Sequence, residues 1–443
     1  MKTATSTLSR PFGGTLYPTE ALTTPGLPSA AGTAADMFAP AEERPLKYTF
    51  CITQRCNLAC PYCYVTKTET AMTWEMARKI VAFIFRHADA ARAVEFGFFG
   101  GEPLLEFGLL KRIVEHIEQQ PAFDADRMGF SLTTNGTVFS DEIADFFNAH
   151  HVKVCISCDG PPHVQDLFRR TKEQGGSSAM VERTLRAALD SLPTVLVNAV
   201  FHPQTLRLLP ETVDYFSSLG LRQIYLNADF SAPWTLSDAE QLSELYDTLG
   251  RRFIAWYLRD DPHFISLIDS KLAVLLRHGY QPAERCQMGK GEMGFTADGG
   301  IYPCERLIGD GVSGAHRIGT VERGLDLSQL TCQLAPGGEL NRECLACELK
   351  NYCMNWCGCS NSFMTGFYNR VGPFLCASEK NAIRTALNVF EVLEQRLGPR
   401  FLHHVSGQPQ LNSRATTGAP PRKNTVGREA VMQSEKQNNR EQT

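Results

Sequence analysis

Six short apolar runs alternate with amphipathic stretches between residues 46 and 228, and this alternation narrows the possible folds more than any other feature. The stretches between the runs, such as MTWEMARKIVAFIFRHA and DEIADFFNAH, have helical periodicity. The apolar runs read as strands: LKYTFCIT, VEFGFFG, GFSLTTN, HVKVCIS, TVLVNAVF and RQIYLNA. Six units in roughly 180 residues average about 30 residues each, the size of a strand–helix repeat. We therefore predict an α/β domain with a parallel sheet, an incomplete (β/α)6 barrel.

Cysteine is the outlier of the composition, with 15 residues in a chain of 443. No apolar run reaches the roughly 18 residues of a membrane span, and the first 20 residues contain no apolar signal core. We therefore expect a cytoplasmic protein whose clustered thiols bind metal rather than form disulfides. The net charge of −4 favours neither a nucleic-acid nor a membrane partner.

The composition changes along the chain and divides it into segments. After residue 232 we expect helices over about 236–258 and 264–278. The cysteine-rich part that follows is expected to contain a hairpin, GFTADGGIYPC, and a helix over about 378–397. We predict a flexible N-terminal extension at 1–44, the partial barrel at 45–232, a helical bridge at 233–282, a loop-rich cysteine-rich domain at 283–400 and a disordered tail at 401–443.

Three cysteines, Cys56, Cys60 and Cys63, follow the first predicted strand in the spacing C-x3-C-x2-C, with Tyr64 directly after the last. A zinc knuckle and a chance cluster are the alternatives. Zinc needs a fourth ligand close by, but Cys51 lies up to about 17 Å from Cys56 along an extended strand. A [4Fe–4S] cluster with three protein ligands leaves one iron open for a substrate or cofactor.

This motif, Tyr64 included, closely resembles that of the radical SAM superfamily. The resemblance implies that the open iron binds the amino and carboxylate groups of S-adenosylmethionine (SAM). An electron from the cluster, supplied by a flavodoxin- or ferredoxin-type donor, then cleaves SAM to a 5′-deoxyadenosyl radical. The family pattern has Ile or Leu where Cys158 stands, a departure that should not affect the chemistry.

Further polar motifs follow the second, third and fourth predicted strands, and in parallel sheets such positions face one cavity. Glycine has no Cβ and lets a backbone approach closely, short polar side chains suit ribose hydroxyls, and arginine can hold a carboxylate. The resemblance implies that the Gly100, Gly101 and Glu102 segment binds the amino group of SAM, and Arg169 its carboxylate. Arg170 is the alternative to Arg169. The residues expected at the ribose are Asn135, Ser157 and Asp159.

A second cysteine system resembles, position for position, the SPASM domain of radical SAM peptide-modifying enzymes, with zinc ribbons as the alternative. The resemblance implies two auxiliary clusters. The second has the ligands Cys344, Cys347, Cys353 and Cys376. The first, which we expect to be [4Fe–4S] as well, has only Cys286, Cys304 and Cys357. Either Cys332 or Cys359 completes the first cluster, or one iron stays open.

SPASM enzymes mostly modify ribosomally made peptides or protein side chains, so the resemblance implies a maturase with a precursor peptide or protein as substrate. Anaerobic sulfatase maturases, which generate formylglycine, use as base an aspartate at the position of Glu305, where the alternative is an exposed hairpin residue. A formylglycine-generating enzyme and a non-catalytic iron–sulfur electron carrier remain alternatives. Residues 1–44 are too few for a winged-helix leader-binding module, so we expect any leader to be bound elsewhere or by a separate protein.

Overall fold

The computed structural model describes residues 45–407 apart from 282–283, 287, 310–313, 327 and 329–340. All described residues belong to the compact unit that ends at Gly407. The predicted N-terminal extension, most of the predicted tail and Cys332 lie outside the described residues. Within the described part of the chain, every helix is too short or too polar to span a lipid bilayer.

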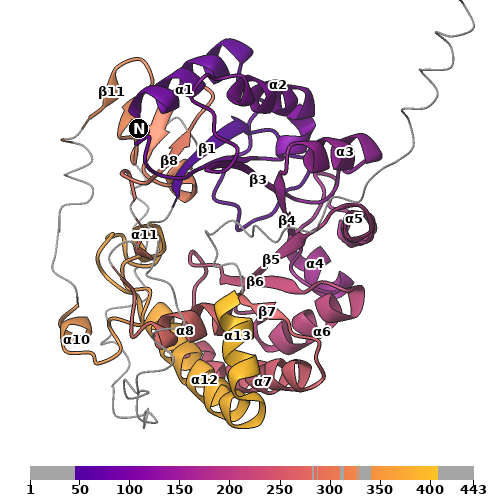
Figure 1. The fold of residues 1–443 in the computed structure, drawn as a ribbon, viewed down its shortest axis with the longest axis vertical. Coiled ribbons are helices and arrows are strands. Elements are labelled where there is room, and N and C mark those ends of the chain that lie inside the picture. Colours follow the sequence, from indigo (N-terminus) through magenta and orange to yellow (C-terminus); the bar gives the residue numbers. More distant parts are fainter. Residues whose placement is uncertain are drawn as a thin grey trace, which may run out of the picture. The chain divides into compact units, whose positions relative to one another are not determined.

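The six predicted strands form, and they lie side by side in chain order as a parallel sheet (Figure 1). They are β1 (Leu46–Thr53), β2 (Val94–Gly100), β3 (Met128–Thr134), β4 (Lys153–Ser157), β5 (Val195–Phe201) and β6 (Gln223–Ala228). A two-residue strand, β7 (Phe264–Ile265), extends the sheet beyond β6. The sheet does not close on itself, because β7 and β11 are its two ends. The predicted incomplete α/β barrel is confirmed.

Helices connect consecutive strands and bury one face each. In α1, Ala77, Ile80, Val81 and Ile84 are buried at helical spacing, and the Thr73 side chain caps the first turn by accepting from the Met76 amide. The helices of the barrel are α1 (Trp74–His87), α2 (Phe107–Glu118), α3 (Asp141–Ala149), α4 (Pro162–Phe168), α5 (Ser178–Ser191) and α6 (Leu209–Leu219), with short 3-10 turns at Pro103–Glu106 and Leu206–Leu208.

The predicted hairpin forms and joins the barrel sheet on the free side of β1. Its strands are β8 (Glu292–Phe295) and β9 (Gly300–Tyr302), followed by β10 (Gly319–Thr320) and β11 (Gly324–Leu325). β8 pairs parallel with β1, with Lys47 opposite Glu292, so one sheet runs across the predicted domain boundary at residue 283. This pairing brings the 3-10 turn Glu305–Leu307, which follows Cys304, to the neighbourhood of β1.

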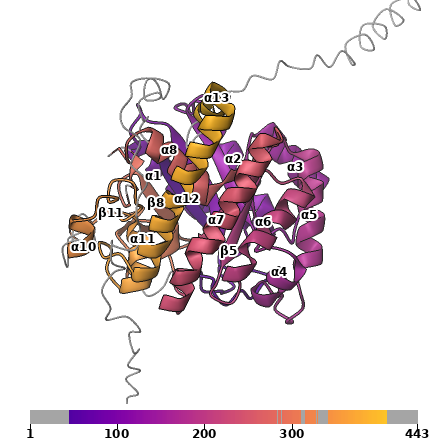
Figure 2. The same ribbon diagram turned by 90° about the horizontal axis from the view of Figure 1, so that it is seen from below.

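The C-terminal helices pack on one another, and one of them also contacts the cysteine-rich segment through Leu375 and Cys376. α12 (Pro373–Leu397) lies beside α7 (Leu236–Leu258) and also contacts α8 (Ser266–Leu276) (Figure 2). α12 begins five residues before the predicted start, because proline is favoured at the first position of a helix, and Cys376 therefore lies within it. Two short helices precede it, α10 (Arg342–Leu345) and α11 (Gly358–Thr365).

The prediction that a disordered tail begins at residue 401 is wrong for its first residues. Gly398 ends α12 at a positive φ of 52°, and α13 (Pro399–Gly407) follows directly. Phe401 is fully buried against the rings of Tyr257 and Phe390, so burial of an aromatic side chain holds this helix on the bundle.

Candidate active site

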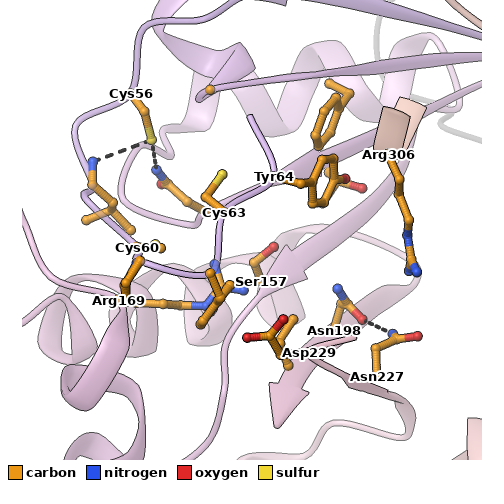
Figure 3. A pocket seen from close by; sticks show the side chains of 18 of the residues that line it. Cys56, Cys60, Cys63, Tyr64, Ser157, Arg169, Asn198, Asn227, Asp229 and Arg306 are labelled. Atoms are coloured by element: carbon orange, nitrogen blue, oxygen red, sulfur yellow. Dashed lines mark hydrogen bonds between the residues drawn. The ribbon is translucent and has the colours of Figure 1, made fainter. Parts of the chain in front are cut away.

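A cavity of about 390 Å³ lies at the carboxyl ends of the parallel strands. Figure 3 shows the thiols of Cys56, Cys60 and Cys63 on one side, and Asn198 with Arg306 on another. Most of the predicted site residues line this cavity: Cys56, Cys60, Cys63, Tyr64, Gly100, Gly101, Asn135, Ser157, Arg169 and Glu305. The structure therefore brings together the ends of five strand–loop segments that are far apart in the sequence.

The Cys loop, residues 56–64, is fastened to the segment after α4. The Ala59 amide donates to the Arg170 carbonyl at 2.7 Å, and Leu58 is buried and forms a bridge with Thr171. These contacts fix the loop over the barrel mouth. The aromatic ring of Tyr64 stacks on Phe99 at a centroid distance of 5.5 Å and closes one side of the cavity.

N–H groups already point at the loop thiols. Cys56 Sγ lies 3.4 Å from the Leu58 amide and 3.6 Å from Asn135 Nδ2, and Lys67 Nζ lies 2.8 Å from Cys63 Sγ. Thiolates of an iron–sulfur cluster are anionic, and hydrogen bonds to their sulfurs stabilise them. The three thiols and their donors therefore fit the cluster that the sequence motif implies.

The two glycines after β2 make room for the Cys loop itself. A Cβ on Gly100 would lie 2.1 Å from the Thr53 carbonyl oxygen, and one on Gly101 would lie 2.0 Å from the Arg55 carbonyl oxygen. The Gly101 amide donates to Thr53 at 2.8 Å, and Gly100 has a φ of 143°. Close packing of β2 against β1 thus requires both glycines, in addition to any contact that their backbones make in the cavity.

Glu102 is fully buried and is not among the residues that line the cavity, and its contact with SAM stays a prediction. Its carboxylate accepts from the amides of Leu104 and Asn135, at 3.0 and 2.7 Å, and from the Thr134 hydroxyl at 2.8 Å. Burial raises the pKa of Glu102, although these three donors oppose the shift. Glu102 therefore positions Asn135 at the cavity wall by accepting a hydrogen bond from its backbone amide.

Asp159 is buried and is not among the residues that line the cavity, and its contact with the ribose stays a prediction. Its Oδ1 lies 2.9 Å from Arg169 Nε and accepts from the Val200 amide at 3.0 Å, while the Tyr62 hydroxyl donates to Oδ2. Both carboxylate oxygens of Asp159 therefore have protein partners, and the carboxylate orients Arg169 and Tyr62.

Of the two neighbouring arginines, the structure places only Arg169 in the cavity wall. Arg169 is buried, and its guanidinium carbon lies 5.5 Å from the centre of the Tyr62 ring. Arg170 is exposed, and its Nε donates to the Asp166 carbonyl at 3.0 Å. The choice of Arg169 over Arg170 therefore agrees with the geometry of the site.

Glu305 lines the cavity from the β8–β9 side. Its carboxylate lies 3.1 Å from Lys47 Nζ and accepts from the Thr49 hydroxyl at 3.0 Å. Burial alone would raise the pKa of Glu305, but the Lys47 ammonium and these hydrogen bonds outweigh it and lower the pKa below its ordinary value. Glu305 is consequently ionised at neutral pH and able to accept a proton.

Several cavity residues escaped the sequence analysis. They are Lys67, Asn198, Asn227, Asp229 and Arg306. Asn227 Nδ2 donates to Asn198 Oδ1 at 2.6 Å, which joins the ends of β5 and β6. Only their place in the sequence could have indicated these residues as part of the cavity. Asn198 and Asn227 lie inside the fifth and sixth predicted strands. Lys67 is four residues after Cys63, and Arg306 is next to Glu305.

The downstream cysteines lie in two regions of the structure, and their assignment to two clusters stays a prediction. Cys286, Cys304 and Cys357 pack in one buried cluster together with Cys359. In the other group, Cys344 and Cys376 pack together around Val371 and Leu375. Cys347 and Cys353 interact electrostatically with them. Iron–sulfur clusters select soft thiolate ligands, so the cysteines of both groups have the chemistry that the predicted ligand sets require.

Comparisons with known proteins agree with this site. Residues 50–216 match the model of the radical SAM superfamily. The serine-type anaerobic sulfatase-maturating enzyme of Klebsiella aerogenes is 27% identical over 337 residues, covering 71% of this chain and 81% of that enzyme. The cysteine-type anaerobic sulfatase-maturating enzyme of Clostridium novyi is 24% identical, covering 60% of this chain and 74% of the relative.

A solved structure, native anSMEcpe with bound AdoMet and the Cp18Cys peptide, superposes with a TM-score of 0.66 at 19% identity, covering 80% of this chain and 99% of that one. This likeness shows a shared fold. Residues 50–216 thus form a radical SAM domain, which together with these relatives supports an enzyme that acts on a peptide or protein substrate. The relatives of the chain include anaerobic sulfatase-maturating enzymes.

Proposed function

We propose that this enzyme abstracts hydrogen from a peptide substrate and thereby matures a ribosomally synthesised peptide, by a crosslink or another C–H functionalisation. The observation that carries the proposal is a single cavity whose wall contains both the three thiols of the Cys loop and the ionised carboxylate of Glu305. Such a cavity can hold a radical-generating cofactor and a proton acceptor around one substrate group.

The cofactor would lie between the Cys loop and the ends of β2 to β4. A [4Fe–4S] cluster with SAM supplies a carbon radical able to break an unactivated C–H bond. Arg169, oriented by Asp159, would bind the SAM carboxylate, and Asn135 and Ser157 its ribose. The stacked Tyr64 and Phe99 rings keep water from the reacting atoms.

The substrate would enter from the side of Asn198, Asn227 and Arg306. Side-chain amides offer both a donor and an acceptor, which suits a peptide backbone. Glu305 then accepts a proton from the substrate, since Lys47 keeps it ionised. The auxiliary cysteines would hold two clusters, which supply an acceptor for the surplus electron of an oxidative reaction.

Formylglycine generation on a sulfatase is supported about equally, because the relatives reported above are anaerobic sulfatase-maturating enzymes. Glu305 is one methylene longer than the aspartate of that family, which shifts the carboxylate by about an ångström and favours a different target. A non-catalytic electron carrier is the least supported alternative, because it would not need Arg169 and Asn135 in the cavity wall.

The test is an anaerobic reaction with reductant, SAM and two peptides in parallel. One is a sulfatase-derived peptide with the target Cys or Ser, and the other is a short peptide encoded beside the gene. We expect 5′-deoxyadenosine in both, and a mass change without an aldehyde in the second. Aldehyde in the sulfatase peptide alone would establish formylglycine generation. No 5′-deoxyadenosine in either reaction would refute the enzyme assignment.

The same assay, supplemented with flavodoxin or ferredoxin and with proteins encoded nearby, tests the expected partners. Stimulation by a neighbouring protein only when the peptide carries its leader would identify a separate leader-binding protein.

A further inference from the structure

Four cysteines meet where α11 begins beside the β8–β9 hairpin, although the family resemblance assigns only three of them to the first auxiliary cluster. The four, named here the Cys quartet, are Cys286, Cys304, Cys357 and Cys359, and they pack around Met288 and Leu307. This observation deepens the proposed function, because it concerns the ligands of a cluster on which that function rests.

Cys359 is the member that the sequence left undecided. It is 5% exposed, and its Sγ lies 3.6 Å from Cys357 Sγ. Cys304 belongs to the same buried cluster. Cys359 thus lies beside Cys357 and shares its buried surroundings with Cys304. A cysteine that only filled an apolar core would instead be surrounded by carbon.

The start of α11 gives Cys359 an electrostatic setting suited to a thiolate. Cys357 is the N-cap residue of this helix and Cys359 lies in its first turn, where backbone amides are unpaired and the helix dipole is positive. Arg306 interacts electrostatically with the thiols of Cys359, Cys357 and Cys304. Amide donors and a partly buried cation together stabilise an anionic cluster.

Glu292 competes for the fourth ligand position. The thiols of Cys286 and Cys304 point at its carboxylate, with Sγ to Oε distances of 3.7 and 3.4 Å. Carboxylates are hard ligands, however, whereas iron–sulfur clusters select soft thiolates. Glu292 also lies opposite Lys47 in the sheet register, so a cation is available to neutralise it.

We infer that Cys359 is the fourth protein ligand of the first auxiliary cluster. A protein thiolate then binds each iron of the first auxiliary cluster. Only the cluster of the Cys loop keeps an iron that can bind a small molecule. The substrate therefore binds through the cavity side chains rather than by ligating the auxiliary cluster.

The experiment uses the full chain in which Cys56, Cys60 and Cys63 are Ala, reconstituted with ⁵⁷Fe, so that only auxiliary clusters contribute. Into this background we introduce Cys359→Ala or Cys359→Ser, with Cys158→Ala as a matched buried-cysteine control, and Glu292→Gln and Cys332→Ala as rivals. The readouts are iron and sulfide per chain and the Mössbauer spectrum.

We expect about eight irons in the background, from two four-iron clusters. Cys359→Ala should lose between one and four of them. Cys359→Ser, which keeps the side-chain size and so the fold, should retain iron but show one site with an altered isomer shift. The three comparison variants should match the background.

Unchanged iron and spectra in both Cys359 variants would overturn the inference, as would the loss appearing in Glu292→Gln or Cys332→Ala instead. A background chain without iron would overturn it together with the auxiliary clusters. None of these outcomes depends on peptide modification. Failure of the proposed function would instead be detected in the peptide assay, so the two failures can be distinguished.

Discussion

Replacing Arg169 by Met, with Arg170→Met as its neighbour and control, tests how the cavity holds SAM. Arg169 lies in the cavity wall and is held by Asp159 at 2.9 Å, whereas Arg170 is exposed. A hydrogen bond to a charged group contributes about 1.5–3 kcal/mol, which corresponds to about a 10- to 150-fold change in Kd. We expect that loss of SAM affinity for Arg169→Met, and none for Arg170→Met.

The assay is anaerobic calorimetric titration of SAM into reconstituted protein, after equal iron content has been verified for the two variants. Arg169→Met also leaves the buried Asp159 carboxylate without its cation, which costs up to about 3–5 kcal/mol of stability. Binding is therefore measured well below the unfolding temperature of each variant. Equal affinities in the two variants, or a weaker Arg170→Met, would refute the assignment of Arg169.

Replacing all three cysteines of the Cys loop by Ala should remove about four irons and abolish 5′-deoxyadenosine formation, with the auxiliary iron retained; iron analysis that shows no change would contradict this. Glu305→Gln should keep SAM cleavage but lower product yield in the peptide assay, and equal yield would exclude it as the base. Because the pKa of Glu305 is lowered, product yield should not fall through its protonation between pH 8 and 6; Lys47→Met removes the cation that opposes burial, so its yield should fall at a higher pH than that of the unsubstituted enzyme. Lys67→Met removes a donor to Cys63 and should make the reduction potential of the Cys-loop cluster more negative at unchanged iron content, as followed by a redox titration; an unchanged potential would contradict this role.

The barrel could be predicted because its determinants are local. β1 and β2 match the apolar runs at both ends, and the α6 and α7 boundaries agree within a residue. Periodicity does not report how far one sheet extends, however. The parallel pairing of β8 with β1, which brings Glu305 near Lys47, joins segments more than 200 residues apart and has no local signature.

For the site, the sequence shows which side chains can bind a ligand but not which already bind each other. Asp159 and Glu102 have suitable chemistry, but their carboxylates are occupied by Arg169 and by the Asn135 amide. Gly100 lines the cavity, and the nearby carbonyl of Thr53 leaves no room for a Cβ at this position. Such pairings depend on tertiary contacts.

The central claim is that the Cys loop holds a four-iron cluster with three thiolates and leaves one iron for SAM. The most direct measurement is electron–nuclear double resonance of the reduced enzyme with SAM labelled by ¹⁵N and ¹³C in its methionyl amino and carboxylate groups. We predict couplings to both labels that vanish in the variant without the three cysteines. Zinc in place of iron in anaerobically purified protein, or a reduced-cluster spectrum that labelled SAM leaves unchanged, would contradict the account.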